Sequence, residues 1–265
     1  MSAPEAQSAA ALEVRDLAVH IGGLVALAGI SFQVPSGAIV SLIGPNGAGK
    51  TTAFNVITGF MQPTRGQVVF DGRDLARLTP DRIAALGLVR TFQRTSLFAG
   101  CSVFDNVLTA LHLRGRVGLL GALLRLPSLR REEAGLRAAT GEILDFVGLA
   151  GRADEIAGNL AYGEQRLLGL AIALAAEPTL LLLDEPAAGL NPSETESFKQ
   201  LVRRVRERGT TVLLVEHDMQ MVMSISDEVL VLNQGSIIAA GTPAAVQRDA
   251  EVIRAYLGTG KRAAA

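Results

Sequence analysis

The 265-residue sequence contains no tryptophan and a single cysteine, and only 4% of its residues are aromatic. The lone cysteine, Cys101, excludes a disulfide within the chain, and we expect it to be a small buried hydrophobic residue. A formal net charge of −1 lacks the basic excess that binding to a phosphate backbone usually needs, so we expect no nucleic-acid partner. Hydrophobic residues at 49% and charged residues at 19% are typical of a folded globular chain.

Long apolar runs are also missing. The most apolar stretch, Leu167 to Leu183, is interrupted by Glu177 and Pro178, and neither piece reaches the ~20 residues of a membrane-spanning helix. The segment Met1 to Ala11 has neither a basic start nor an apolar core, so we predict no secretory signal. We expect residues 1–11 to form a disordered tail and residues 259–265 to be loose. Work at a membrane would therefore go through a partner protein.

Strand and helix patterns predict an α/β fold, and the length allows one large domain or one domain with a smaller subdomain. Alternation in Leu12 to His20 predicts a strand, and further strand signals up to Val34 indicate an antiparallel, hairpin-rich start. Helical spacing dominates from about Phe104 to Gly158, which we interpret as an inserted α-helical subdomain. Four apolar runs separated by helical segments predict buried strands of a parallel sheet. These runs are Ala38–Ile43, Leu180–Leu183, Thr211–Val215 and Val229–Leu232.

A glycine-rich segment lies between the first of these strands and a predicted helix over Thr51 to Thr58. Its spacing is that of a loop whose backbone N–H groups, with the N-terminus of the next helix, form an anion site. We therefore predict that it binds nucleotide phosphates, that Lys50 reaches the β- and γ-phosphates, and that the Thr51 hydroxyl binds Mg²⁺. The segment consists of Gly44, Pro45, Asn46, Gly47, Ala48, Gly49, Lys50, Thr51 and Thr52.

Two carboxylates, Asp184 and Glu185, end the apolar strand that begins at Leu180. Ligands of open parallel sheets collect at the carboxyl ends of the strands. Asp184 is a candidate Mg²⁺ ligand, directly or through water, and Glu185 is a candidate base that polarises an attacking water. The alternative is that both acids only cap the next element.

Together with these two motifs, four shorter segments resemble the ATPase cassette of ABC transporters, over about Leu12 to Gly258. The resemblance implies an ABC-type P-loop ATPase fold, in a single domain over residues 12–258. This fold has a RecA-like core, an N-terminal antiparallel β subdomain and a helical insert of about residues 96–176. The resemblance also implies ATP and Mg²⁺ as cofactors. The four segments are the signature sequence Leu160–Gln165, the Q-loop glutamine Gln93, the D-loop Ala188–Asn191 and the switch histidine His217.

The same resemblance implies a head-to-tail dimer, in which each ATP lies between Lys50 of one chain and Gly163 of the other. Whether the second ABC ATPase chain is identical (a homodimer) or related (a heterodimer) stays open. The implied catalytic residues are Glu185, His217, Gln93 and Lys50. The implied metal ligands are Thr51, Gln93 and Asp184. The nucleotide contacts from the signature segment are Ala161, Tyr162, Gly163 and Glu164.

Within the ABC family, several stretches resemble the ATPase subunits of branched-chain amino acid importers, the Liv type. This likeness implies partner membrane permease subunits, an amino acid binding protein outside the membrane, and a place on the cytoplasmic face of the bacterial inner membrane. The rival interpretations are a lipopolysaccharide-export ATPase and a soluble ABC ATPase that serves DNA repair or the ribosome. The stretches are Leu160–Gly163, Pro186–Pro192, Gly44–Asn55, Thr58–Phe60, Ile253–Gly258 and, as an insertion, Arg114–Arg131.

Two positions that would contact the nucleotide depart from the family pattern. Ile21 stands where an aromatic residue normally stacks on adenine, so we expect weaker stacking on the base. Ala161 lacks the hydroxyl that the usual signature serine offers to the γ-phosphate, which leaves more of that contact to backbone donors.

An importer ATPase also needs a surface that contacts its permeases. Phe98, Val103 and Phe104 are candidates by position, and ordinary core packing is the alternative for all three. The apolar run Val117 to Leu126 favours internal packing over contact with a permease or the bilayer.

Overall fold

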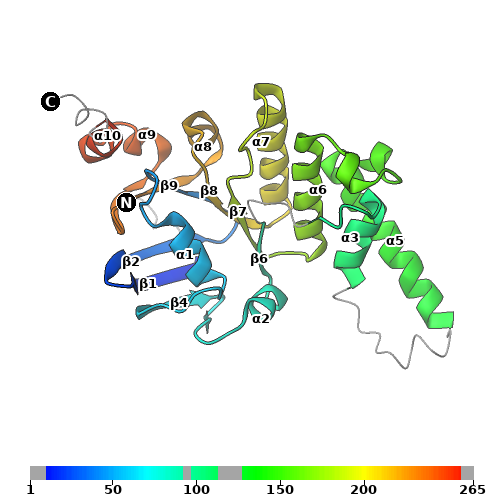
Figure 1. Cartoon of the computed structure of the whole chain (residues 1–265), viewed down its shortest axis with the longest axis horizontal. Helices are drawn as coiled ribbons and strands as arrows, with labels where there is room; N and C mark the ends of the chain where they lie inside the picture. The colour runs from blue at the N-terminus through cyan, green and yellow to red at the C-terminus, as the bar shows by residue number, and fades with distance from the viewer. Residues whose placement is uncertain (1–9, 92–96, 113–126, 258–265) are drawn as a thin grey trace, which may run out of the picture. The chain divides into compact units, whose positions relative to one another are not determined.

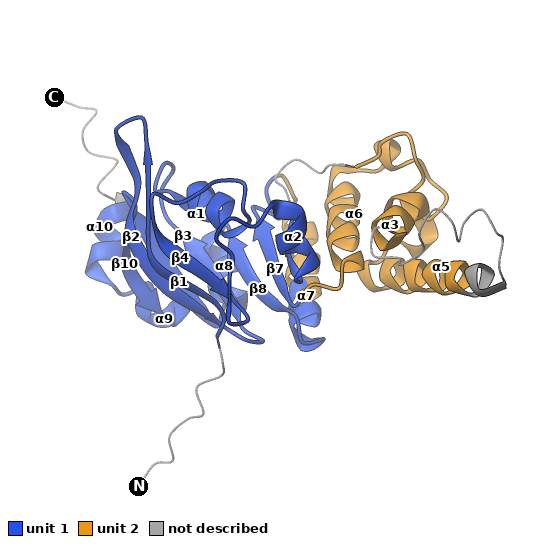
Figure 2. Ribbon diagram, turned by 90° about the horizontal axis from the view of Figure 1, so that it is seen from below, with its two compact units in different colours: residues 1–90, 179–188, 202–265 blue, residues 91–178, 189–201 orange. Residues whose placement is uncertain are grey.

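The structure, a computed structural model, describes residues 10–91, 97–112 and 127–257 (Figure 1). The chain divides into two compact units (Figure 2). The first unit consists of residues 1–90, 179–188 and 202–265, and the second of residues 91–178 and 189–201. Outside the described residues lie Gln93, the run Val117 to Leu126, residues 1–9 of the expected N-terminal tail and the expected C-terminal tail 259–265. Residues 10 and 11, also expected in the N-terminal tail, instead belong to the first strand.

The strands are β1 (Ala10–Ile21), β2 (Leu24–Pro35), β3 (Ile39–Ile43), β4 (Arg65–Phe70), β5 (Arg73–Asp74), β6 (Leu88–Arg90), β7 (Leu180–Asp184), β8 (Thr211–Val215), β9 (Glu228–Asn233) and β10 (Ser236–Gly241). The helices are α1 (Lys50–Ile57), α2 (Pro80–Ala85), α3 (Val103–His112), α5 (Pro127–Val147), α6 (Tyr162–Ala175), α7 (Pro192–Glu207), α8 (Met219–Ile225), α9 (Pro243–Val246) and α10 (Ala250–Leu257), with 3₁₀ turns at Ala150–Arg152 and Ala157–Asn159.

The first unit contains an antiparallel sheet in the order β2-β1-β4-β5. Its long hairpin, β1 with β2, confirms the strand that alternation predicts, although β1 begins at Ala10 rather than at Leu12. Leu12, Val14 and Leu17 are buried in the core, whereas Arg15 is exposed. The alternation therefore reflects a sheet with one face against the core.

The second sheet of this unit has the order β10-β9-β3-β8-β7-β6 and is parallel except for the β9–β10 pair. Every residue of β3, β7 and β8 is buried, as expected for the continuous apolar runs. Strands β3, β8 and β7 are direct neighbours. Their carboxyl ends therefore meet at one edge, and the segments that follow Ile43, Asp184 and Val215 converge there.

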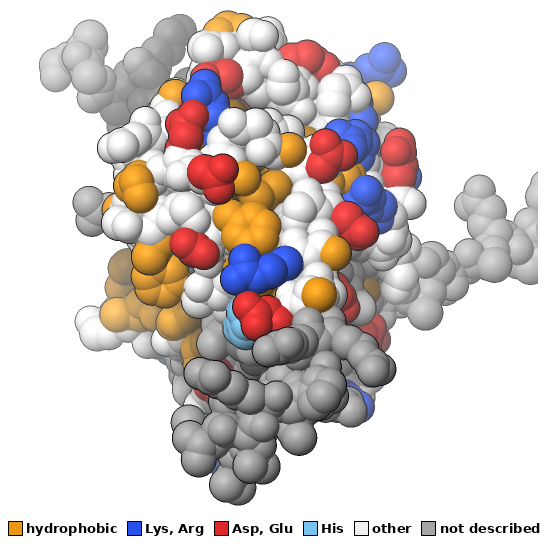
Figure 3. Space-filling view, turned by 90° about the vertical axis from the view of Figure 1, so that its right-hand side faces the viewer, with side chains coloured by type: hydrophobic (Ala, Val, Ile, Leu, Met, Phe, Trp, Pro, Cys, Tyr) orange, Lys and Arg blue, Asp and Glu red, His pale blue; other side chains and the backbone are white. Residues whose placement is uncertain are grey.

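The second unit is helical, and its helices α3, α5 and α6 pack on one another. Apolar residues at helical spacing, such as Val103, Val107, Leu144 and Leu168, are buried. On its surface in Figure 3, hydrophobic side chains lie among charged side chains of both signs. The domain bounds of 12–258, with a helical insert of about 96–176, stay a prediction. None of the helices in the described part of the chain is both long and apolar enough to cross a bilayer.

One expectation about this unit is wrong. Cys101 is exposed, not buried. It belongs to the turn before α3, where its N–H donates to the carbonyl of Phe98 at 2.9 Å. The main chain there turns at the surface, so the small apolar side chain has no core to enter.

Candidate nucleotide site

The glycine-rich segment forms the turn between β3 and α1. Gly47 and Gly49 have φ angles of 79° and 110°, in the left-handed region that favours glycine. A Cβ at Gly49 would lie 2.6 Å from the carbonyl oxygen of Ala26, and one at Gly44 would overlap the carbonyl of Leu232. Glycine is therefore required at these positions for the loop to pack against the two neighbouring strands.

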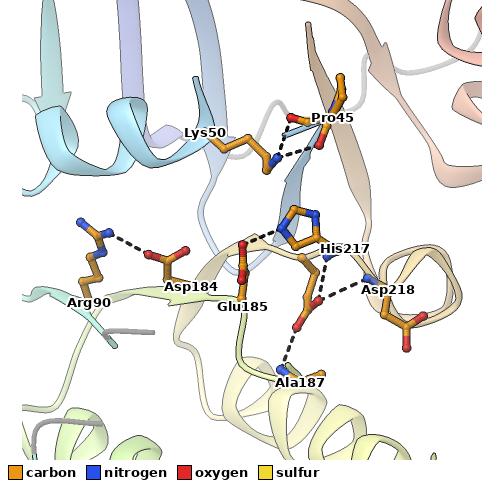
Figure 4. Close-up of polar contacts among 10 residues, drawn as sticks. Pro45, Lys50, Arg90, Asp184, Glu185, Ala187, His217 and Asp218 are labelled. Carbon is orange, nitrogen blue, oxygen red and sulfur yellow. Dashed lines mark hydrogen bonds and ion pairs between the residues drawn. The ribbon is translucent and has the colours of Figure 1, made fainter. Parts of the chain in front are cut away.

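Lys50 is the first residue of α1 and is 6% exposed. Its Nζ donates to the carbonyl oxygens of Gly44 at 2.6 Å and Pro45 at 3.1 Å (Figure 4). Burial lowers the pKa of Lys50 below its ordinary value, and the negative charges of Glu185 and Asp184 oppose this shift. The ammonium group is thus held over the loop, facing the two carboxylates that end β7.

Asp184, at the carboxyl end of β7, is paired with Arg90 of β6. Arg90 Nη2 donates to Asp184 Oδ2 at 2.7 Å, and both side chains are 7% exposed. Its Nη1 donates to Asn55 Oδ1 of α1 at 2.8 Å. Asp184 is therefore a buried carboxylate with a buried cation beside it, and Arg90 is a member of this site that the sequence did not predict.

Glu185 follows directly and pairs with His217, which comes after β8. The Nε2–H of His217 donates to Glu185 Oε1 at 2.6 Å. Glu185 has a φ of 49°, an uncommon conformation for a residue other than glycine. The left-handed backbone turns the chain sharply after the strand, and the side chain of Glu185 points toward His217 (Figure 4).

A second buried carboxylate, Glu216, joins the two loops that carry Glu185 and His217. Its Oε1 accepts from the N–H of Ala187 at 2.7 Å, and its Oε2 accepts from the N–H groups of His217 at 2.8 Å and Asp218 at 3.3 Å. Sequence reasoning gave Glu216 no role of its own. Its position beside His217, at the end of a buried strand, was the signal that could have identified it.

The structure brings together the predicted residues of the first unit. Lys50, Asp184, Glu185 and His217 lie at the carboxyl ends of β3, β7 and β8, and Thr51 and Thr52 follow Lys50 in α1. Ile21 ends β1 and is 48% exposed.

The signature segment belongs to the second unit, where it begins helix α6. The N–H of Ala161 donates to the carboxylate of Glu164 at 3.1 Å, but alanine has no side-chain oxygen that could complete a reciprocal cap. A Cβ at Gly163 would lie 2.7 Å from Glu194 Oε1, so only glycine fits without displacing that carboxylate.

Tyr162 contacts the D-loop within the same unit. A Cβ at Gly189 would lie 2.8 Å from Cε1 of Tyr162, so the ring rests on this glycine. The Tyr162 hydroxyl accepts from Arg166 at 2.5 Å. A capping box starts α7, because Asn191 and Glu194 exchange hydrogen bonds of 2.8 and 3.0 Å.

Comparison with known proteins decides the family. A family model described as ABC transporter matches residues 27–188. The chain belongs to the ABC transporter family. A second model, described as branched-chain amino acid ATP-binding cassette transporter, matches residues 236–262. These matches confirm the resemblance on which the ABC-type ATPase prediction rests.

Among the relatives in this family, the branched-chain amino acid transport ATP-binding protein LivG of Escherichia coli K12 is 47% identical over 250 residues, which cover 93% of this chain and 97% of LivG. BraF of Pseudomonas aeruginosa, which carries the same description, is 46% identical over 248 residues with the same coverage. The lipopolysaccharide-export ATP-binding protein LptB of Haemophilus influenzae is less similar, at 34% over 229 residues, which cover 86% of this chain and 89% of LptB.

Solved structures support the same assignment. A crystal structure of the ADP conformation of an ABC transporter cassette is 31% identical and has a TM-score of 0.82, over 95% of this chain and all of that one. A nucleotide-free ABC cassette is also 31% identical, with a TM-score of 0.81 over 94% of this chain and 99% of that one. The predicted α/β ABC ATPase fold is thus confirmed.

Proposed function

We propose that this chain is the ATP-binding and ATP-hydrolysing subunit of an importer for branched-chain or related amino acids. The site geometry carries the ATPase part, because Lys50, Asp184 and the Glu185–His217 pair meet at adjacent strand ends beside a glycine-rich loop. The similarity to LivG and BraF over nearly the whole chain supports the transported substrate class.

The loop and the start of α1 hold the phosphates. Backbone N–H groups and the positive end of the helix favour an anion there. Lys50 then exchanges the carbonyl oxygens of Gly44 and Pro45 for phosphate oxygens, a short movement of a group that already lies over the loop.

The donor set fits Mg²⁺. This ion usually takes only one or two protein carboxylates, together with phosphates and water, so a ready cage of acids is not needed. Within the described ranges no three His, Cys, Asp or Glu side chains gather into such a cage. Thr51 and Asp184 supply a hydroxyl and a carboxylate, and Gln93 is proposed as the third ligand. When bound, Mg²⁺ neutralises charge on the phosphate oxygens.

Glu185 orients the attacking water and takes its proton. His217 donates to the Glu185 carboxylate at 2.6 Å, and the same N–H turns to the γ-phosphate when ATP is present. Glu216 keeps the two loops at a fixed separation, since it accepts hydrogen bonds from both. The partner's signature segment, Ala161 to Glu164, completes the site in a head-to-tail dimer with an identical or a related ABC ATPase chain.

Phe98 is the candidate for the permease surface whose side chain is most exposed. Of the three candidates, Val103 is fully buried and Phe104 is partly covered by the guanidinium of Arg137, 5.9 Å from its ring centroid, whereas Phe98 is 59% exposed. The buried Asn106 fixes the Phe98 backbone, accepting from its N–H at 2.9 Å and donating to its carbonyl at 3.1 Å. We propose that permeases dock here on the cytoplasmic face of the inner membrane.

The test begins with the tagged full chain isolated from its own membranes, with identification of what copurifies. Two multi-span permeases, a second cassette and an amino acid binding protein are the expected partners. Reconstituted in vesicles, that assembly should take up leucine only with ATP. Copurification of lipopolysaccharide-export components, or of ribosomes or DNA-repair proteins without permeases, would contradict the importer proposal and leave the ATPase part standing.

The sole cysteine offers a matched test of the docking surface. Cys101 is exposed and adjoins Phe98. A maleimide should label it in the isolated chain and should label it much more slowly in the assembled transporter. Equal labelling rates in both would contradict docking at this surface.

A further inference from the structure

The buried guanidinium of Arg90 joins three elements of the first unit. Its Nη2 donates to Asp184 Oδ2 at 2.7 Å, and its Nη1 donates to Asn55 Oδ1 at 2.8 Å. The same Nη1 lies 3.4 Å from Thr58 Oγ1, and the guanidinium carbon lies 5.5 Å from the centroid of the Phe54 ring. Arg90 thus connects β6, the carboxyl end of β7 and helix α1.

The burial of this pair gives it consequences that a surface pair lacks. Each side chain is only 7% exposed, so the charge of either one is poorly compensated by water. Arginine presents its donors in a rigid planar fork and fixes the direction of the groups it binds, which lysine does not do. Arg90 therefore determines both the charge balance and the orientation of Asp184.

The two proposed Mg²⁺ ligands with described positions stand on different elements, Thr51 on α1 and Asp184 on β7. Arg90 hydrogen-bonds to both of these elements. We propose that Arg90 is the positioning residue for the magnesium ligands. It holds Asp184 by Oδ2, leaves Oδ1 to bind Mg²⁺ directly or through water, and fastens α1 to the same group. This inference rests on the proposed function, under which Thr51 and Asp184 bind Mg²⁺ beside the nucleotide.

The experiment is ADP binding to the full chain, measured by calorimetry in Mg²⁺ and in EDTA. Arg90→Met removes the fork and keeps an unbranched apolar side chain. We define the Mg²⁺ gain as the ratio of the ADP affinity in Mg²⁺ to that in EDTA. Arg90→Met is expected to reduce this gain by about tenfold, as for other groups that orient metal ligands, and to leave the ADP affinity in EDTA within about twofold of the wild-type value. Arg90→Lys is expected to lose most of the same gain, because it keeps the charge without the fork.

The control is the same substitution in an Asp184→Asn background. Because Arg90 acts mainly through Asp184, Arg90→Met should there reduce the Mg²⁺ gain by no more than the roughly threefold expected for loss of the contact with Asn55. Equal losses of affinity in Mg²⁺ and in EDTA, in both backgrounds, would show a merely structural role and overturn the inference.

A milder variant keeps the test decisive if Arg90→Met does not fold. Asn55→Ala spares the ion pair and removes its anchor in α1, so the Mg²⁺ gain should fall by roughly threefold. No change in that gain would count against the inference. A wild-type chain that binds ADP equally in Mg²⁺ and EDTA would overturn it together with the proposed metal site, whereas a failure to transport amino acids would leave it intact.

Discussion

Helices α1 and α6 both begin at a glycine-containing segment that the sequence assigns to nucleotide binding, yet their first turns differ in charge. Helix α1 follows Gly49, has no side-chain cap and no acidic residue in its first turn, and starts with the cation Lys50. Helix α6 follows Ala161, and both the Glu164 carboxylate and an oxygen of Glu194 lie beside its first residues.

This difference in charge distinguishes the two proposed anion sites, which both lie at helix N-termini. The N-terminus of a helix attracts negative charge. A phosphate at the start of α1 would meet the cation Lys50, which faces Asp184 and Glu185. A phosphate at the start of α6 would meet the carboxylates of Glu164, which is paired with Arg152, and of Glu194. Under the proposed function, α1 holds the nucleotide of its own chain and α6 contacts the nucleotide of a partner chain.

The largest effect is expected from a change that alters neither helix start. Glu185→Gln removes the proposed base and keeps both anion sites, so ATP binding should persist while turnover falls by about a hundredfold or more. Steady-state phosphate release and ATP binding by filter assay measure the two quantities. Turnover near the wild-type rate would remove Glu185 from the role of base.

A substitution at α6 tests the other side of the comparison. Gly163→Ala places a Cβ 2.7 Å from Glu194 Oε1 and should displace that carboxylate. ATP turnover should fall about tenfold through misplacement of the partner-facing turn, while ADP binding by the isolated chain stays unchanged.

The matched control is Gly141→Ala in α5, where an added Cβ meets nothing within 4 Å. That variant should keep wild-type turnover. A second substitution, Glu194→Ala, should restore part of the turnover lost in Gly163→Ala. If ADP binding falls in Gly163→Ala, the two helix starts are not independent, and the comparison breaks down.

The pH dependence of ADP affinity tests whether Lys50, at the start of α1, binds the phosphates. Burial lowers the pKa of Lys50, and a bound phosphate favours the protonated amine and raises that pKa again. ADP affinity should therefore be constant below the lowered pKa and decline as pH rises through it, with proton uptake on binding in that window. Calorimetry in two buffers of different ionisation enthalpy measures this uptake, and proton release instead would reverse the sign of the argument.

The smallest effect is expected at the base of the nucleotide, away from both helices. Ile21 is 48% exposed at the end of β1 and gives adenine no aromatic face. Ile21→Tyr should raise the preference for ATP over GTP by about threefold, the scale of one aromatic contact. Competition of GTP against ATP in the wild-type chain supplies the baseline, and a large wild-type preference for ATP would refute weak stacking at Ile21.

Local patterns predicted the elements whose signal lies in consecutive residues. The buried strands β7 and β8 follow from unbroken apolar runs, and the glycine-rich loop follows from its spacing. The three-residue strand β6 was missed, because so short a run carries no clear period. Strand β10 was also missed, and its residues are mostly only partly buried.

The supporting residues of the site could not be predicted in the same way. Arg90 finds its partners Asn55 and Asp184 far away in the sequence, and nothing local indicates which acid an isolated arginine will meet. Glu216 accepts hydrogen bonds from backbone N–H groups, and no residue type in the sequence marks such a partner. Sequence motifs therefore identify the groups proposed to touch the nucleotide, whereas the groups that hold them follow only from tertiary contacts. The catalytic and binding roles given to the motif residues stay predictions.

The division of the chain into segments has a practical consequence for anyone who wishes to exchange its parts. The polypeptide passes between the units four times, since one unit consists of three segments and the other of two. Residues 179–188, which contain Asp184 and Glu185, are a short segment of the first unit that is preceded and followed in the chain by segments of the helical unit. One of the four crossings falls inside α7. No single cut can release the helical unit, so a chimera with a relative needs four matched junctions, one of them within a continuous helix.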